Sequence, residues 1–339
     1  NGFLKWQAKQ NPEYHSPLNA RGDLIKYSSP CYAQSEQFDT LLEKFGNHLR
    51  AGKTRAAYLP AIRNFFSVCG KNPEAISLDD IQKWKDFLNQ RNRERWGRNI
   101  SDRTVANHLS AIAKFNRFLK ADGKQHIRGI DLDSEFVRPR LSSRREKPIQ
   151  LDPDEVKSLL DEITKAKTKI AVRDHALFSL IFCCALRVGE AVNMKTGHIL
   201  FFPSRAVVQI HGRKRKRSET QDLTFEDRAD LKYLKSVRQW MDLAKTGEEE
   251  PLFCPCLWDR KNREHVIRPG TGIEEREMQK RFRLWADKAG IRKMDRRRVI
   301  HSLRHTRAAD LLKNRKWDIV EVREFLGHAN IATTDVYLH

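Results

Sequence analysis

Five side chains in the second half of this 339-residue chain could together break a phosphodiester bond. His301 and Arg304 lie three residues apart, so a helix would project both from one face. Arg187 follows a long apolar stretch, and a planar guanidinium can grip two phosphate oxygens at once. His328 comes later, and Tyr337 lies nine residues beyond it. Two cations for an oxyanion, histidines for proton transfer and a phenol nucleophile suffice for such chemistry without a metal.

Each of these signals also has a purely structural explanation. Arg187 could pair with Glu190 at a helix end, and Gly327-His328 could be an ordinary helix cap. His305 is expected to face elsewhere on the helix and to be a structural neighbour of the pair. A lone tyrosine is more often packed than reactive, and its phenol, with a pKa near 10, needs surrounding cations before it can attack.

A basic run lies between two predicted short strands at 207–210 and 221–224. Its cations could bind a phosphate backbone. One lysine of the run, Lys216 or Lys214, could instead reach a cleaved site and protonate the departing 5′ oxygen. The residues of this run that are expected to contact the DNA phosphate backbone are Arg213, Lys214, Arg215 and Arg217.

Helical periodicity dominates residues 35–120 and predicts four short amphipathic helices in a small bundle. Pro60 should bend the second helix or mark its start, and Ser77 and Ser101 should cap the third and fourth. The apolar positions of the four helices are Phe38, Leu41, Leu42, Phe45 and Leu49; Tyr58, Ile62, Phe65 and Phe66; Ile81, Trp84, Phe87 and Leu88; and Val105, Leu109, Ile112 and Leu119.

A second domain is predicted over residues 150–339, beginning with Asp152 as a helix N-cap and Pro153 as the first helical residue. The stretch 176–186 should be a buried helix, and further helices are expected at 227–245, 274–289, 302–313 and 318–327. The basic, proline-containing segment 121–149 could follow a phosphate backbone or serve only as a tether. Residues 1–34 should form an irregular arm that contacts DNA, a neighbouring protein or neither.

The composition favours a polyanionic partner, because the formal net charge is +21. Nucleic acid is the leading interpretation. An anionic membrane is the weaker one, since no apolar run approaches the roughly 20 residues of a membrane span and no secretory signal opens the chain. The cysteines at 31, 69, 183 and 184 should be reduced thiols. Cys254-Pro255-Cys256 with His265 lacks the second pair that a zinc site needs, so neither metal nor cofactor is expected.

The order and spacing of these motifs closely resemble the active site of the tyrosine recombinases, the integrase family that includes the Xer proteins, lambda integrase and Cre. Arg187, a hairpin lysine, the His301-x-x-Arg304 motif, Leu326-Gly327-His328 and Tyr337 stand in the family's order. The resemblance covers residues 151–339 by motif and reaches back to about residue 35 by architecture. It implies a mainly α protein with a small β-hairpin, in which a SAM-like helical core-binding domain and an α+β catalytic domain clamp duplex DNA.

The resemblance also implies a role for each residue. Tyr337 would form a 3′-phosphotyrosyl link, and Arg187 and Arg304 would hold the non-bridging phosphate oxygens. His301 would be the general base, and Glu190 would orient Arg187. His328 would donate a hydrogen bond to the phosphate. Lys216 would be the general acid, with Lys214 as the alternative, because the residues after Gly212 depart from the family's Gly-Lys-Gly-x-Lys hairpin.

By the same resemblance, a tetramer on two specific DNA sites would exchange strands through a Holliday junction, with accessory proteins as further partners. The protein would be located in the cytoplasm at the nucleoid, or in the nucleus if the source is eukaryotic. The sequence opens at Asn1 and ends at His339, two residues after Tyr337. Members of the family usually continue with a segment that docks on a neighbouring protomer. We therefore hypothesise that the sequence is a trimmed form of a longer chain. A type IB topoisomerase and a catalytically silent DNA-binding protein are the alternatives. The sequence does not distinguish integration, excision, resolution and inversion.

Overall fold

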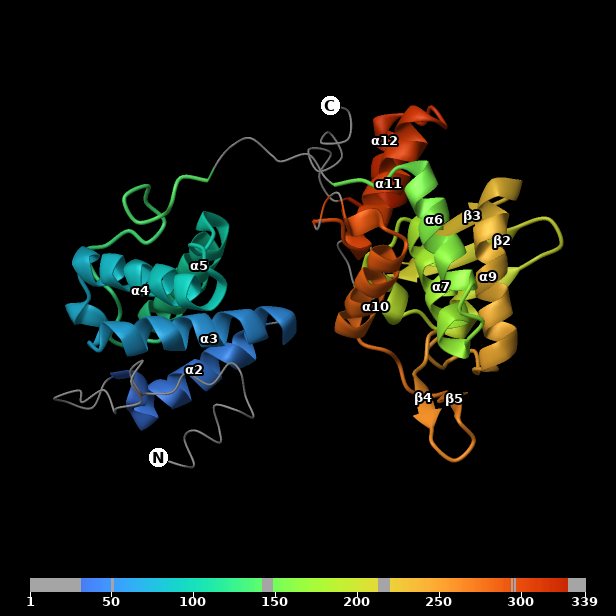
Figure 1. The fold of residues 1–339 in the computed structure, drawn as a ribbon. Helices are drawn as coiled ribbons and strands as arrows, with labels where there is room; N and C mark the ends of the chain where they lie inside the picture. Colours follow the sequence, from blue (N-terminus) through green and yellow to red (C-terminus); the bar gives the residue numbers. More distant parts are fainter. Residues whose placement is uncertain are drawn as a thin grey trace. The chain divides into compact units, whose positions relative to one another are not determined.

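The computed structural model describes residues 32–49, 52–141, 149–212, 220–293, 295 and 297–328 (Figure 1). The chain divides into two compact units, Asn1–Ser143 and Arg144–His339. Each unit has its own apolar core. The described part of the chain is mainly helical with small antiparallel sheets, as the sequence predicts. None of its helices is long and apolar enough to cross a membrane.

The described part of the first unit is helical, and the four predicted helices are confirmed. Ser77 caps α4 in a capping box with Asp80, and the Ser101 hydroxyl accepts the Thr104 N–H at 3.2 Å at the start of α5. The elements are η1 (Tyr32–Gln34), α2 (Glu36–His48), α3 (Gly52–Cys69), η2 (Pro73–Ala75), α4 (Leu78–Trp96) and α5 (Asp102–Ala121).

The core of this unit is an aromatic cluster in which Phe38, Phe66 and Phe115 meet edge to face. Two details differ from the sequence prediction. Of the two alternatives for Pro60, the helix start is wrong, because Pro60 lies inside α3, eight residues after its first residue. Phe87, expected on the apolar face of α4, is 38% exposed, whereas Ile81, Trp84 and Leu88 of that face are buried.

The segment after α5 belongs to the first unit rather than to a connector that begins at residue 121. Ile127, Leu132 and Val137 are buried against the helical core. The Asn116 side chain fixes the segment to α5, since its amide donates to the Ile127 carbonyl at 3.1 Å and its oxygen accepts the Ile127 N–H at 2.7 Å. These apolar residues follow no helical period, which is why the sequence suggests a linker there.

The first helix of the second unit begins where the sequence predicts, with a capping box between Asp152 and Glu155 and Pro153 at the first helical position. The predicted helices and the β2–β3 pair are confirmed, whereas β1, β4, β5 and the short α8 are additional. The elements are α6 (Pro153–Thr164), α7 (Lys169–Cys183), α8 (Val188–Val192), η3 (Thr196–His198), β1 (Ile199–Phe201), β2 (Ala206–His211), β3 (Thr220–Phe225), α9 (Arg228–Ala244), β4 (Cys256–Asp259), β5 (Glu264–Ile267), α10 (Glu275–Lys288), η4 (Ile291–Lys293), α11 (Ile300–Lys313) and α12 (Ile319–Leu326).

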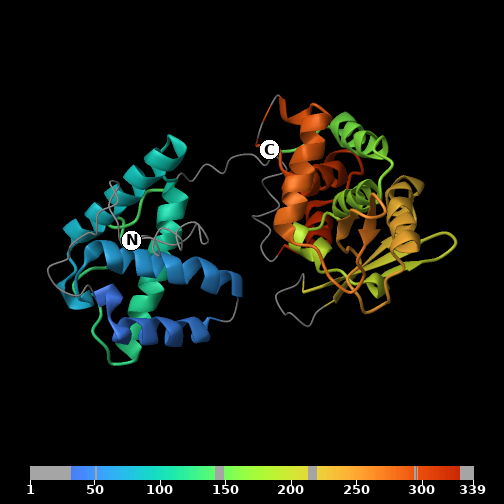
Figure 2. The same ribbon diagram turned by 60° about the horizontal axis from the view of Figure 1, so that its bottom comes forward.

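Helix α7 is the centre of this unit and is buried on nearly all sides over its second half. It packs against α6, α9 and α11 and lies between α9 and α10 in both views (Figures 1 and 2). The strands form an antiparallel sheet in the order β1-β2-β3, with Val208 of β2 opposite Ile199 and Leu223. Strands β4 and β5 form a separate hairpin.

Helix α11 is held in place by polar contacts as well as by apolar packing. Arg307, 2% exposed, donates from Nη2 to both carboxylate oxygens of Asp230 on α9 at 2.8 Å. The Thr306 hydroxyl accepts the Leu151 N–H at 2.8 Å, which fixes the start of the unit against α11. Since a buried charge is tolerated only with a partner, the Arg307–Asp230 pair restricts how α11 can lie on α9. Both contacts are one turn or less from Arg304.

Candidate active site

The end of α7 places Arg187 at the start of α8. After α7 the chain turns at Ala185, whose φ of +47° is unusual for a residue other than glycine. The Leu186 N–H returns to the Ile181 carbonyl at 3.0 Å. This turn directs the Ala185 carbonyl inward, where it accepts a hydrogen bond from Nη1 of Arg304. One turn of backbone therefore sets the position of both arginines.

Arg187 and Glu190 form both a helix cap and an ion pair. The Arg187 N–H donates to Oε2 of Glu190 at 2.8 Å, and its Nη1 lies 2.6 Å from Oε1. The Arg187 side chain is 44% exposed, whereas that of Glu190 is 12% exposed. The ion pair between Arg187 and Glu190 that could explain the arginine structurally is thus present. The Arg187 guanidinium also reaches solvent, where it can bind an anion.

Arg304 is fully enclosed, with a side-chain exposure of 1%. In addition to the Ala185 carbonyl, its Nη2 donates to the Leu326 carbonyl at 2.8 Å and contacts Nε2 of His328 at 3.0 Å. Its Nη1 lies 3.7 Å from Oε2 of Glu190. The Glu190 carboxylate therefore lies between the two guanidinium groups and offsets part of their mutual repulsion.

His328 is presented by the cap of α12. Gly327 is left-handed at φ +63°, its N–H bonds to the Glu324 carbonyl at 2.9 Å, and the His328 N–H bonds to the Arg323 carbonyl at 3.0 Å. This Schellman-type ending confirms the predicted cap and places the histidine beside Arg304. Because Arg304 can only donate, Nε2 of His328 accepts, and the proton of the neutral ring resides on Nδ1.

His301 and His305 contact each other, contrary to the expectation that His305 faces elsewhere. Their ring centroids are 4.6 Å apart and the rings are nearly perpendicular, at 86°. The two residues lie one helical turn apart on α11, which brings their side chains onto the same face. The surrounding protein lowers the pKa of His301 by removing hydration, and Arg304 and Arg187 lower it further. Burial, assisted by His301, Arg304 and His328, lowers the pKa of His305 to about 3.

The predicted nucleophile and the basic loop lie outside the described residues: Tyr337, Lys216, Lys214, Arg213, Arg215 and Arg217. The two ends of that loop are described. Strand β2 ends at His211, and β3 begins at Thr220. The Gln221 amide donates to the Glu324 carbonyl in the last turn of α12 at 2.7 Å. The base of the basic hairpin is thus attached to the helix that presents His328.

The structure brings Arg187, Glu190, His301, Arg304 and His328 into one cluster. The sequence missed the two backbone carbonyls that hold Arg304, because a carbonyl acceptor carries no residue-type signal. It also missed the His301–His305 contact, although the spacing of four residues could have indicated it.

The cysteines fit the predicted reduced thiols where they are described. Cys183 and Cys184 are buried thiols and Cys69 is a partly buried thiol, and none of the three is in a disulfide within the described residues; Cys31 lies outside them. Within the described ranges no group of three or more histidine, cysteine or acidic side chains is arranged to hold a metal ion. Burial raises the pKa of the Cys254 thiol to about 11, so this thiol is protonated at neutral pH.

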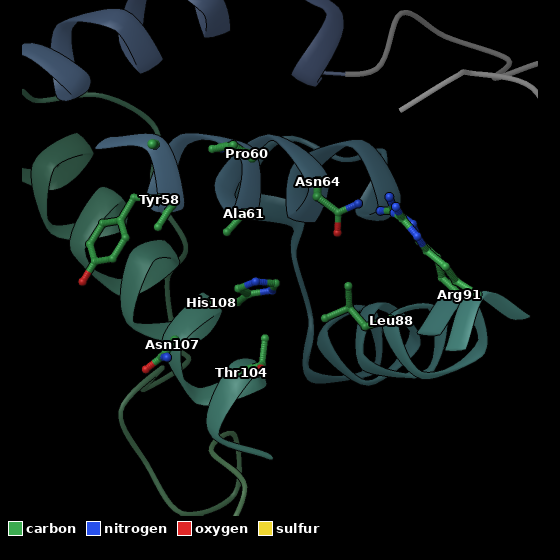
Figure 3. A pocket seen from close by; sticks show the side chains of 12 residues that line it. Tyr58, Pro60, Ala61, Asn64, Leu88, Arg91, Thr104, Asn107 and His108 are labelled. Carbon is green, nitrogen blue, oxygen red and sulfur yellow. The ribbon is translucent and has the colours of Figure 1, made fainter. Parts of the chain in front are cut away.

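The first unit contains a separate cleft of about 420 Å³ between α3, α4 and α5 (Figure 3). The described residues that line it include Arg91 and Arg95 but no carboxylate. Burial lowers the pKa of Arg91, and the neighbouring Arg95 lowers it further. The His108 ring projects into the space between the helices, and its buried Nδ1 has no hydrogen-bond partner among the described residues (Figure 3). Such a surface is suited to an anionic ligand.

Comparison with known proteins decides the family. Residues 150–339, more than half of the chain, match the model of the phage integrase family. The chain is 30% identical over 278 residues to tyrosine recombinase XerC of Alcanivorax borkumensis, covering 80% of this chain and 78% of that protein. This chain is a tyrosine recombinase. The resemblance inferred from the motifs is thereby confirmed, and with it an enzyme that cleaves and rejoins DNA in site-specific recombination.

Other relatives agree with the assignment. Tyrosine recombinase XerC of Neisseria meningitidis serogroup B is 27% identical to this recombinase over 301 residues, covering 88% of this chain and 89% of that protein. Among solved structures, XerH bound to a palindromic difH substrate has a TM-score of 0.64 at 19% identity, covering 99% of this chain and 90% of its own. A lambda integrase tetramer bound to a Holliday junction has a TM-score of 0.61 at 12% identity, covering 99% of this chain and 84% of the lambda integrase chain. These two likenesses concern the fold.

Proposed function

We propose that Arg187, Arg304, His301 and His328 bind one scissile DNA phosphate and that Tyr337 attacks it. The observation that carries this proposal is the position of Glu190, whose carboxylate is 2.6 Å from one guanidinium and 3.7 Å from the other. A phosphate next to the exposed Arg187 would meet a second cation that is already fixed in place. Such preorganised cations stabilise charge that develops in a transition state.

The environment of each group suits its proposed role. His301, with its lowered pKa, is neutral near pH 7 and can accept the Tyr337 proton. Arg187 and Arg304 would hold the non-bridging oxygens, and His328 would donate a hydrogen bond to the phosphate. Lys216, or alternatively Lys214, would protonate the 5′ oxygen as the P–O bond breaks. The phosphotyrosyl ester retains the energy of that bond, so a 5′ hydroxyl can reverse the step without ATP.

The proposed partner is duplex DNA that carries a specific recombination site. The solved relatives include XerH bound to a difH substrate and a lambda integrase tetramer bound to a Holliday junction. We propose the same type of assembly here: four copies on two sites, two rounds of strand exchange through a Holliday junction, and accessory proteins where the site requires them. The location would be the cytoplasm, at the nucleoid, or the nucleus in a eukaryotic source.

The helical domain, residues 35–120, is proposed to bind the same DNA. Support comes from the cleft of Figure 3, which Arg91, Arg95, Asn107 and His108 all line. Among the described residues, Nδ1 of His108 has no hydrogen-bond partner. Arginine can contact phosphate or guanine, and asparagine can contact adenine. The basic segment that follows, up to residue 149, would lie along the backbone. Residues 1–34 would form an arm, and residues 150–339 the catalytic domain.

The experiment that tests this function captures protein-linked DNA from cells that express the chain, under denaturing conditions, and sequences the attached ends. Adducts at a few sites that disappear in Tyr337→Phe are expected. Tyr233→Phe is the matched control, because that phenol packs on Phe182 in the core, and it should keep the adducts. Adducts that persist in Tyr337→Phe would refute the nucleophile, and adducts scattered without sequence preference would favour a topoisomerase.

A further inference from the structure

The contact between His301 and His305 gives one turn of α11 a second histidine that the mechanism above does not use. The His305 ring is partly buried, whereas the His301 side chain reaches the surface. With centroids 4.6 Å apart at 86°, the edge of one ring meets the face of the other. This geometry is the preferred one for aromatic pairs, and it restricts rotation of the more exposed ring.

A general base needs a fixed ring as well as a suitable pKa. Catalytic histidines are usually oriented by a third group that hydrogen-bonds their second nitrogen. Among the described residues no hydrogen bond reaches either ring nitrogen of His301, although its neighbour Arg304 has three acceptors. The aromatic contact that holds the His301 ring within the described part of the chain is the one with His305.

The charges around the two rings favour an uncharged His305. Arg304 on α11, His328 after α12 and the His301 ring all disfavour a proton on it, in addition to its burial. At His301, Arg304 and Arg187 disfavour a proton and Glu190 favours one. His305 therefore adds no positive charge at physiological pH, and its contribution to His301 is the packed ring itself.

We propose that His305 is a positioning residue that holds the His301 ring in the orientation from which it accepts the Tyr337 proton. This inference rests on the proposed role of His301 in cleavage. It assigns to His305 a steric function, which a planar ring of similar size can perform without ring nitrogens. The proposal therefore separates two substitutions that would otherwise be expected to behave alike.

His305→Phe retains the edge-to-face contact, whereas His305→Ala removes it. Misplacing a catalytic group by about 1 Å can cost about 100-fold in rate, so His305→Ala should slow cleavage about 10- to 100-fold. His305→Phe should stay within about threefold of the parent chain. Both variants should bind DNA with unchanged Kd, because the effect lies in the chemical step rather than in ground-state binding.

The test measures single-turnover formation of the phosphotyrosyl adduct as a function of pH, on a duplex that carries the sequence recovered from the cellular adducts. The acid limb reports the protonation of His301. In His305→Ala that limb should move toward pH 6.5 as the ring regains water, and in His305→Phe it should stay in place. Equal activity of both variants and the parent would overturn the proposal. An equal loss of cleavage rate in folded His305→Ala and His305→Phe would also overturn it, because the ring nitrogens of His305 would then be required for cleavage.

A second measurement, made without DNA, keeps this inference distinct from the proposed function. The His301 ring resonances, assigned by their loss in His301→Gln, are titrated by NMR in the parent chain and both His305 variants. A His301 pKa that rises in His305→Ala alone is the expected result, and an unmoved pKa in all three would contradict the positioning role. Persistence of adducts in Tyr337→Phe would refute the proposed function but would leave this titration unchanged.

Discussion

Replacing Glu190 by glutamine should expose the repulsion between the two site arginines. The glutamine oxygen can still accept the Arg187 N–H that the carboxylate accepts at 2.8 Å, so the cap of α8 is retained. What disappears is the negative charge that lies 2.6 Å from one guanidinium and 3.7 Å from the other. The substitution therefore isolates the electrostatic contribution of Glu190 from its role in the helix cap.

The two ion pairs contribute unequally. Glu190 and Arg304 are 12% and 1% exposed, and at their separation of 3.7 Å two unit charges attract by about 4 kcal/mol at an effective dielectric constant near 20. Arg187 is 44% exposed, so solvent screening limits its pair to no more than about 1 kcal/mol. Arg304 keeps its neutral acceptors in the variant. We expect Glu190→Gln to lower the free energy of unfolding by about 3 kcal/mol, in the lower part of the range for breaking a buried pair.

The assay is thermal and urea unfolding of the full chain, followed through the transition of the second unit. A loss of about 3 kcal/mol corresponds to a fall in Tm of about 6–12 °C for a unit of this size. Glu321→Gln is the matched control, because Oε2 of Glu321 accepts the Asp318 N–H at 2.8 Å in the same kind of capping box. Within the described part of the chain, no arginine forms an ion pair with Glu321. Glu321→Gln should lower the free energy of unfolding by about 1 kcal/mol or less.

Duplex DNA binding adds a second criterion. Glu190→Gln removes an anion from between two cations, so the folded variant should bind DNA at least as tightly as the parent chain. A loss of stability no larger than that of Glu321→Gln would refute the electrostatic reasoning. Weaker DNA binding by a variant with an intact second-unit transition would refute the idea that the two guanidiniums face one phosphate.

Three further perturbations test other parts of the structure. The pKa of His305 is lowered to about 3, so the unfolded chain binds more protons than the folded chain below pH 6.5. Stability should therefore fall as the pH drops from 6.5 toward about 3, by up to about 1.4 kcal/mol per pH unit, and the lowered pKa of His301 acts in the same direction. Urea titrations should show a smaller dependence of stability on pH in His305→Phe. Asp174→Asn removes a fully buried carboxylate that binds two arginines and should cost about 3–5 kcal/mol in the same titrations. Ser77→Ala breaks the capping box of α4 and should cost about 1 kcal/mol in the first-unit transition, similar to Ser101→Ala.

The sequence determined the features that depend on near neighbours along the chain. The capping boxes at Ser77 and Asp152 were predictable because their partners lie three residues away. The helices were predictable because their apolar positions repeat with the helical period. The spacing of His301 and Arg304 gave the face of α11, and the order of the motifs gave the family.

Only the tertiary structure decided how these pieces combine. Arg304 is held by the carbonyls of Ala185 and Leu326, 119 and 22 residues away, and backbone acceptors look alike in every sequence. The Glu190 carboxylate lies between two arginines because α7 and α11 pack together, not because of any local pattern. Likewise, Ile127 belongs to no helical pattern, and its burial follows from packing against the helical core and from its two backbone hydrogen bonds to the Asn116 side chain. Long-range packing therefore turned residues of suitable chemistry into one site.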